Sequence, residues 1–146
     1  MVYGPATTCR SSLDTAKKDI NYITLAIFAP ILILAGIAGF LVPQQQSLTS
    51  GATPYNLFHI FFGCLGLIFL LKGHAALFNL GFGLIDLYQA AASFMNLPPK
   101  QYFLWTRVDD VLHIVIGLAL VVIGGYGLFR QSRHNRPSDE VRTATR

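Results

Sequence analysis

The sequence predicts an all-α fold, a four-transmembrane-helix bundle built from two parallel helical-hairpin repeats. Three observations predict it. Charged residues make up only 12% of the chain, against about 25% in soluble domains. Four apolar stretches are each close to the roughly 20 residues that a helix needs to cross a bilayer. Finally, the first two stretches resemble the last two in the same order.

The four predicted spans cover residues 22–42, 55–71, 75–95 and 108–129. Pro43 ends the first, Lys72 the second and Arg130 the fourth, while the third ends before two consecutive prolines. Inside the spans only Asp86, Asp109 and Asp110 carry a formal charge. Helices without a polar face are typical of membranes, where each backbone group must bond within its own segment.

The chain therefore divides into two hairpins and two tails. We predict a polar N-tail at 1–21, a first hairpin at 22–72, a second hairpin at 73–130 and a basic C-tail at 131–146.

Basic residues predict the orientation of the spans, because short cytoplasmic loops collect Lys and Arg. The tails and the second connection hold Arg10, Lys17, Lys18, Lys72, Arg130, Arg133, Arg136, Arg142 and Arg146. The opposite side holds only Lys100 and Arg107. We therefore expect an integral, multi-pass membrane protein with both termini on the cytoplasmic, or equivalent inner, side.

An internal repeat relates the two hairpins. Residues 56–63 read NLFHIFFG and residues 110–117 read DVLHIVIG, so an ungapped shift aligns His59 with His113 and Gly63 with Gly117. Because each repeat contains two spans, both copies keep one orientation, as in a parallel repeat.

This His-x-x-x-Gly pattern, preceded by Asn or Asp, resembles an uncharacterised bacterial family of small four-helix integral membrane proteins catalogued as a domain of unknown function. The resemblance covers roughly residues 22–130. It implies the fold and the membrane location, and it brings no activity, cofactor or catalytic residue.

The repeated histidines are the first candidate site. His59 and His113, with Asn56 and Asp110 orienting the rings, could bind a tetrapyrrole such as chlorophyll or haem b, because neutral imidazole is a good axial ligand. The structural alternative makes Asn56 and Asp110 helix N-caps, with the histidines three residues later bonding back to them.

A polar stripe on the third span is the second candidate. Asn79, Asp86, Gln89 and Ser93, together with Gly83, share one helical face that we expect to point into the bundle. They form a structural hydrogen-bond network, or Asp86 serves a proton or ion site, or the stripe makes a polar contact to a cofactor or a partner subunit.

Four aromatic residues lie near the loops on the side of the membrane opposite the termini. They fit an aromatic belt at the membrane–water interface and are Tyr55, Tyr102, Phe103 and Trp105.

Function follows from these features. No catalytic or metal-binding motif is present in the sequence, and the basic residues flank membrane helices, which argues against nucleic-acid binding. We expect a non-enzymatic structural or accessory subunit of a larger membrane complex, whose partners are the lipid bilayer and other membrane subunits. The alternatives are a tetrapyrrole-binding protein of a photosynthetic or respiratory complex, using His59 and His113, and a small proton-coupled transporter using Asp86.

Overall fold

The computed structural model describes residues 19–43 and 46–134. These residues form five helices and no strand: α2 (Ile20–Leu41), α3 (Thr53–Leu71), α4 (Ala75–Met95), α5 (Lys100–Phe103) and α6 (Arg107–His134). Four of them, all except α5, are long and apolar enough to span a membrane. The predicted all-α class and the four spans are therefore confirmed, and the tails lie largely outside the described residues.

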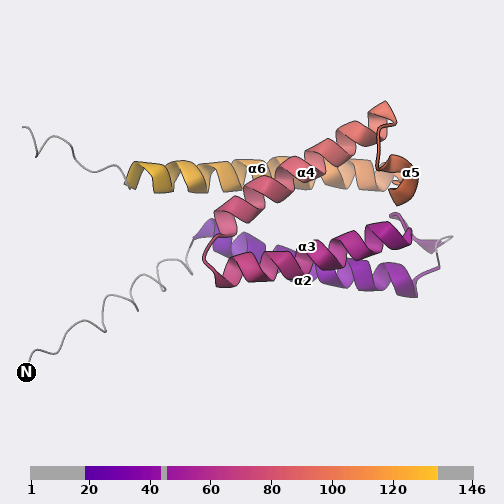
Figure 1. Cartoon of the computed structure of the whole chain (residues 1–146), viewed down its shortest axis with the longest axis horizontal. Helices are drawn as coiled ribbons and strands as arrows, with labels where there is room; N and C mark the ends of the chain where they lie inside the picture. Colours follow the sequence, from indigo (N-terminus) through magenta and orange to yellow (C-terminus); the bar gives the residue numbers. More distant parts are fainter. Residues whose placement is uncertain (1–18, 44–45, 135–146) are drawn as a thin grey trace, which may run out of the picture.

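The helices are arranged as two pairs. α2 packs mainly along α3, and α4 mainly along α6. Figure 1 shows α2 and α3 side by side, with α4 crossing α6 above them. α2 begins and α6 ends at one end of the bundle, which we call the terminal end; α5 lies at the other, which we call the loop end (Figure 1).

Glycines bring the helices of each pair into close contact. A Cβ added at Gly63 of α3 would lie 2.8 Å from the Ala29 carbonyl oxygen of α2. At Gly117 of α6 it would lie 3.0 Å from the Gly83 carbonyl oxygen of α4. Small residues of this kind let helix backbones approach in membranes, where no hydrophobic effect drives helices together.

The core between the two pairs is aromatic. Phe82 of α4 contacts Phe28 of α2 and both Phe58 and Phe62 of α3, with ring centroids 5.3–6.2 Å apart.

Polar contacts join the two helix pairs at both ends of the bundle. At the terminal end, the Asn79 side chain donates to the Asn21 carbonyl oxygen at 3.2 Å and to its Oδ1 at 3.1 Å.

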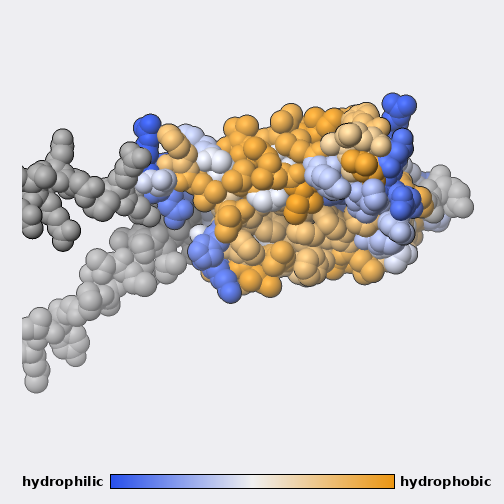
Figure 2. Space-filling model, turned by 45° about the horizontal axis from the view of Figure 1, so that its top comes forward, coloured by the Kyte–Doolittle hydropathy of each residue, from blue (hydrophilic) through white to orange (hydrophobic). Residues whose placement is uncertain are grey.

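The outer surface is apolar along the length of the bundle. On α2, Ile23, Ile27, Ile31 and Leu34 are 48–64% exposed and follow one another at helical spacing. Figure 2 shows a broad hydrophobic belt with hydrophilic residues gathered at its two ends. This distribution is the one that contact with a lipid bilayer requires, since charged groups avoid the hydrocarbon core.

Two expectations about helix starts are wrong. Asn56 and Asp110 do not cap α3 and α6, because the helices begin at Thr53 and Arg107 and place both residues one turn inside. α6 starts instead with a reciprocal capping box. The Thr106 N–H donates to Asp109 Oδ2 at 2.8 Å, and the Asp109 N–H donates to Thr106 Oγ1 at 3.3 Å.

Candidate functional site

A hydrogen-bond network at the loop end joins the two hairpins. We call Ser50, Tyr55, Thr106, Asp109 and His113 the Tyr55 network. Tyr55 comes from α3, and Asp109 and His113 come from the first two turns of α6. The Tyr55 hydroxyl donates to Asp109 Oδ1 at 2.9 Å and lies 3.3 Å from His113 Nε2.

Asp109 is the centre of this network. It is completely buried, and every group around its side chain is a donor. Its Oδ2 accepts bonds from the Ser50 N–H at 2.9 Å, the Thr106 N–H at 2.8 Å and the Thr106 hydroxyl at 2.9 Å. A carboxylate, which only accepts hydrogen bonds, satisfies all four donors at once.

The loops add one further hydrogen bond and one close contact between the hairpins. The Ser50 hydroxyl donates to the Phe103 carbonyl oxygen of α5. The Thr106 hydroxyl also lies 3.0 Å from the Leu48 carbonyl oxygen. The connection between α2 and α3 is therefore held against the connection between α4 and α6.

His59 and His113 both contact Tyr55, but they are not equivalent. The ring centroids are 4.3 Å apart for Tyr55 and His59, and 6.1 Å for Tyr55 and His113. His59 Nδ1 lies 2.9 Å from the Tyr55 carbonyl oxygen one turn earlier, so it carries the proton and leaves the Nε2 lone pair free. The hydroxyl of Tyr55, in contrast, engages Nε2 of His113.

This difference bears on the tetrapyrrole alternative. A backbone carbonyl on one ring nitrogen commonly orients a ligating histidine, so the bond made by His59 suits a ligand. His113 would have to give up its bond to Tyr55 before its Nε2 could face a metal. Asn56 does not orient either ring. Its side chain packs against Gly39 of α2 and donates to the Gly51 carbonyl oxygen at 3.4 Å.

The polar stripe of α4 points into the protein, as expected. Asn79, Asp86, Gln89 and Ser93 are all at most 4% exposed. Asn79 makes the bonds to Asn21 described above, while the Cβ of Asp86 faces Gly117 of α6. The stripe therefore contributes to both interfaces of α4 instead of forming one continuous network.

Two of the predicted belt aromatics lie inside the protein. Tyr55 is 5% exposed and Trp105 is 8% exposed, because both pack with Ala52, Ala92 and Phe103 at the loop end. Tyr102, at 61% exposed, does face outward as a belt residue would.

Sequence reasoning missed most of the Tyr55 network. Ser50 and Thr106 were not singled out, and Asp109 was noted only as a charge at a helix start. One signal was available, because Thr106 and Asp109 have the spacing of a capping box before an apolar run. Nothing local in the sequence indicates that Tyr55 reaches Asp109 across 54 residues.

Among the described residues, no group of three or more His, Cys, Asp or Glu side chains could hold a metal ion. No family model, curated protein or solved structure matches the chain. Membership of the four-helix family therefore stays a prediction. The fold and the apolar surface define the class of the molecule: it is a multi-pass α-helical membrane protein.

Proposed function

We propose that the protein is a non-enzymatic structural or accessory subunit of a larger membrane complex. One observation carries this proposal. Gly81 of α4 and Gly125 of α6 lie in membrane-spanning helices, yet a Cβ added at either would meet no atom within 4 Å. A helical glycine costs roughly 1 kcal/mol relative to alanine, so its presence calls for a compensating contact.

The other glycines of this helix pair supply the comparison. At Gly83, Gly117, Gly124 and Gly127 an added Cβ would lie within 3.0 Å of a neighbouring atom. Each of those glycines is therefore explained by packing inside the chain. Gly81 and Gly125 are not, and close approach of a helix from another subunit would explain them in the same way.

Both glycines turn to the same side of the pair. Gly124 packs directly against Leu80 between antiparallel helices. Gly81 follows Leu80 by one residue, and Gly125 follows Gly124 by one residue. One residue is a rotation of about 100° around a helix, and because the two helices are antiparallel, both rotations lead to the same face of the pair. The large side chains nearest Gly81 on this face, Leu77, Leu84 and Tyr88, are more than half exposed. A partner helix would meet an apolar face here that carries no side chain at the two glycines.

The test compares co-purification of glycine variants with that of alanine controls. We expect the double variant Gly81→Leu, Gly125→Leu to lose the membrane protein that co-migrates with the wild type after gentle extraction and cross-linking from its native membrane. Ala35→Leu with Ala38→Leu is the matched control, since both alanines are exposed on α2 of the other hairpin. Wild-type protein that migrates alone, or a complex that survives the glycine changes, contradicts the proposal.

Two structural proposals accompany this function. The excess of basic residues supports an orientation with both termini on the inner side. The internal repeat is supported by the contacts of Gly63 and Gly117, because a single 54-residue shift relates both the glycines and the facing residues, Ala29 and Gly83.

A further inference from the structure

Several buried polar atoms beside the Tyr55 network have no hydrogen-bond partner within the described part of the chain. They are Trp105 Nε1, Asp110 Oδ1, His113 Nδ1 and both polar atoms of the Gln89 amide. All four residues are at least nine-tenths buried. Leaving such a group unsatisfied destabilises the folded state, so folded proteins keep few of them.

These atoms belong to residues that lie close together. The rings of Trp105 and His113 have centroids 5.7 Å apart. Asp110 and His113 are one turn apart on α6 and therefore share a face. Gln89 is one turn before Ala92, which packs with Tyr55 and Trp105 in the loop-end core. The four residues thus lie near one another where α4, α6 and the α5 connection meet.

The Tyr55 network determines which of these groups donate. Since Asp109 acts as an acceptor throughout, Tyr55 gives its single hydroxyl proton to Asp109. His113 Nε2 must then carry a proton and donate to the Tyr55 oxygen. A neutral imidazole has only one N–H, so His113 Nδ1 is left as a lone pair.

The region therefore presents both kinds of hydrogen-bonding group. Trp105 Nε1 only donates, whereas Asp110 Oδ1 as a carboxylate and His113 Nδ1 accept. A hydroxyl group can accept from the indole and donate to the imidazole at the same time.

We propose that this region is an internal binding site for a hydroxyl group, held between Trp105 Nε1 and His113 Nδ1 and flanked by Gln89 and Asp110. Two sources share this chemistry: buried water and the hydroxyl head of a membrane lipid. The site lies within one chain, so it does not depend on the proposed partner subunit.

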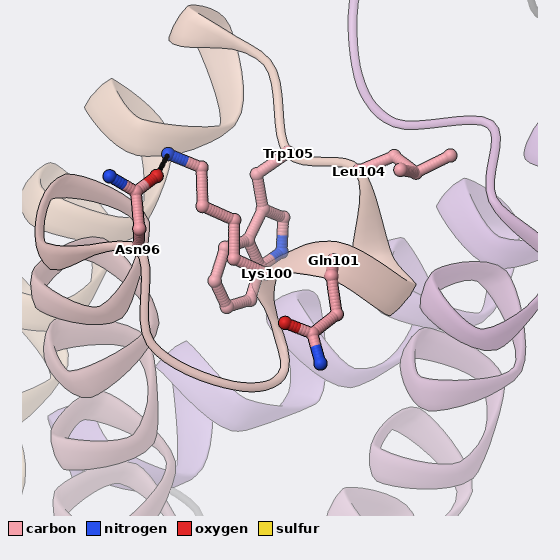
Figure 3. A pocket seen from close by; sticks show the side chains of 5 residues that line it. All are labelled: Asn96, Lys100, Gln101, Leu104 and Trp105. Carbon is pink, nitrogen blue, oxygen red and sulfur yellow. Dashed lines mark hydrogen bonds between the residues drawn. The ribbon is translucent and has the colours of Figure 1, made fainter.

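A pocket lies on the other side of Trp105. Its volume is about 500 Å³, and Asn96, Lys100, Gln101, Leu104 and Trp105 line it. Figure 3 shows the Trp105 indole between the Lys100 and Gln101 side chains, with Lys100 bonded to Asn96. Trp105 is therefore both a wall of the outer pocket and a donor of the inner site.

Trp105 also makes the proposal testable, because it is the only tryptophan in the chain. In ¹⁵N-labelled protein in nanodiscs of defined phospholipid, its indole N–H gives one NMR resonance. We expect a cross peak from this proton to water if water is the occupant. A cross peak to a co-purified lipid, lost after delipidation, identifies the second source. An indole proton with neither contact overturns the proposal.

A second measurement tests the protonation of His113, whose Nδ1 is the proposed acceptor. The ¹⁵N shifts of His113, assigned by their loss in His113→Asn, should report a neutral ring with the proton on Nε2. A ring protonated on Nδ1 contradicts the proposed donor pattern. Gln89→Leu should weaken the indole cross peak, while Tyr102→Phe, which changes an exposed side chain that does not line the pocket, should leave it unchanged.

Discussion

Tyr55 joins the first hairpin to the second through its hydroxyl group. Its backbone belongs to α3 of the first hairpin, and its hydroxyl bonds Asp109 and approaches His113 in the second. Its carbonyl oxygen also fixes the tautomer of His59. One residue therefore sets the donor pattern of two histidines, through its backbone for His59 and its side chain for His113, and joins the hairpins at the loop end.

Removing this hydroxyl should lower stability without changing the fold. We expect Tyr55→Phe to reduce the free energy of unfolding by about 1–2 kcal/mol, because Asp109 loses a donor while remaining buried. The measurement is unfolding in mixed micelles followed by circular dichroism. Tyr102→Phe removes a hydroxyl from a side chain that is 61% exposed and should have little effect. Equal losses in the two variants would show that the Tyr55 bonds contribute nothing specific.

At the scale of the elements, each long helix has one close partner and looser contacts with helices of the other hairpin. α3 approaches α2 through Gly63, which faces the backbone of Ala29 and Ile33. The looser contacts between hairpins consist mainly of phenylalanine rings and the polar ties at each end. Since aromatic rings repack more easily than interlocked backbones, we expect each hairpin to be the more rigid unit.

Adding one methyl group should distinguish buried from open glycines. In Gly63→Ala the new Cβ would lie 2.8 Å from a backbone carbonyl oxygen that cannot move aside. We expect a loss of about 1–3 kcal/mol, as for other overpacked sites. Gly81→Ala meets nothing within 4 Å and should leave the isolated protein unchanged or slightly more stable. Parallel unfolding curves test the pair, and a reversed order would contradict the packing described.

Much of the fold could be predicted because membrane helices depend on local properties. Apolar length alone located all four spans, and residues 75–95 were predicted with the bounds that α4 has. The helix starts were less predictable. Asn56 fits an N-cap by type, but Thr53 and Pro54 extend α3 by one turn before it. Helical periodicity also identified the buried stripe of α4.

The candidate site was predicted only in part. The histidines were found because they recur in the repeat, yet their partners come from distant loops. Tyr55 and Trp105 have the composition of a membrane-interface belt, and only the close approach of α3, α5 and α6 buries them. Tertiary contacts of this kind leave no periodic signal in the sequence.

For the whole molecule, the position of polar groups follows the bilayer. Large apolar side chains cover the outside of the four long helices, and polar side chains are inside or at the two ends (Figure 2). The first residue of α2 and the last turn of α6 share the terminal end with the α3–α4 turn (Figure 1). This arrangement requires four crossings, with every second connection on the same side of the membrane.

Site-directed labelling of single cysteines tests these four crossings directly. In a background with Cys9→Ser and Cys64→Ser, the variants Ser47→Cys and Gln101→Cys should react with a membrane-impermeant maleimide from one side of sealed vesicles. Lys72→Cys should react only from the other side, and Ile27→Cys, in the lipid-facing surface of α2, should react from neither. Labelling of Lys72→Cys and Gln101→Cys from the same side would contradict the four-span bundle.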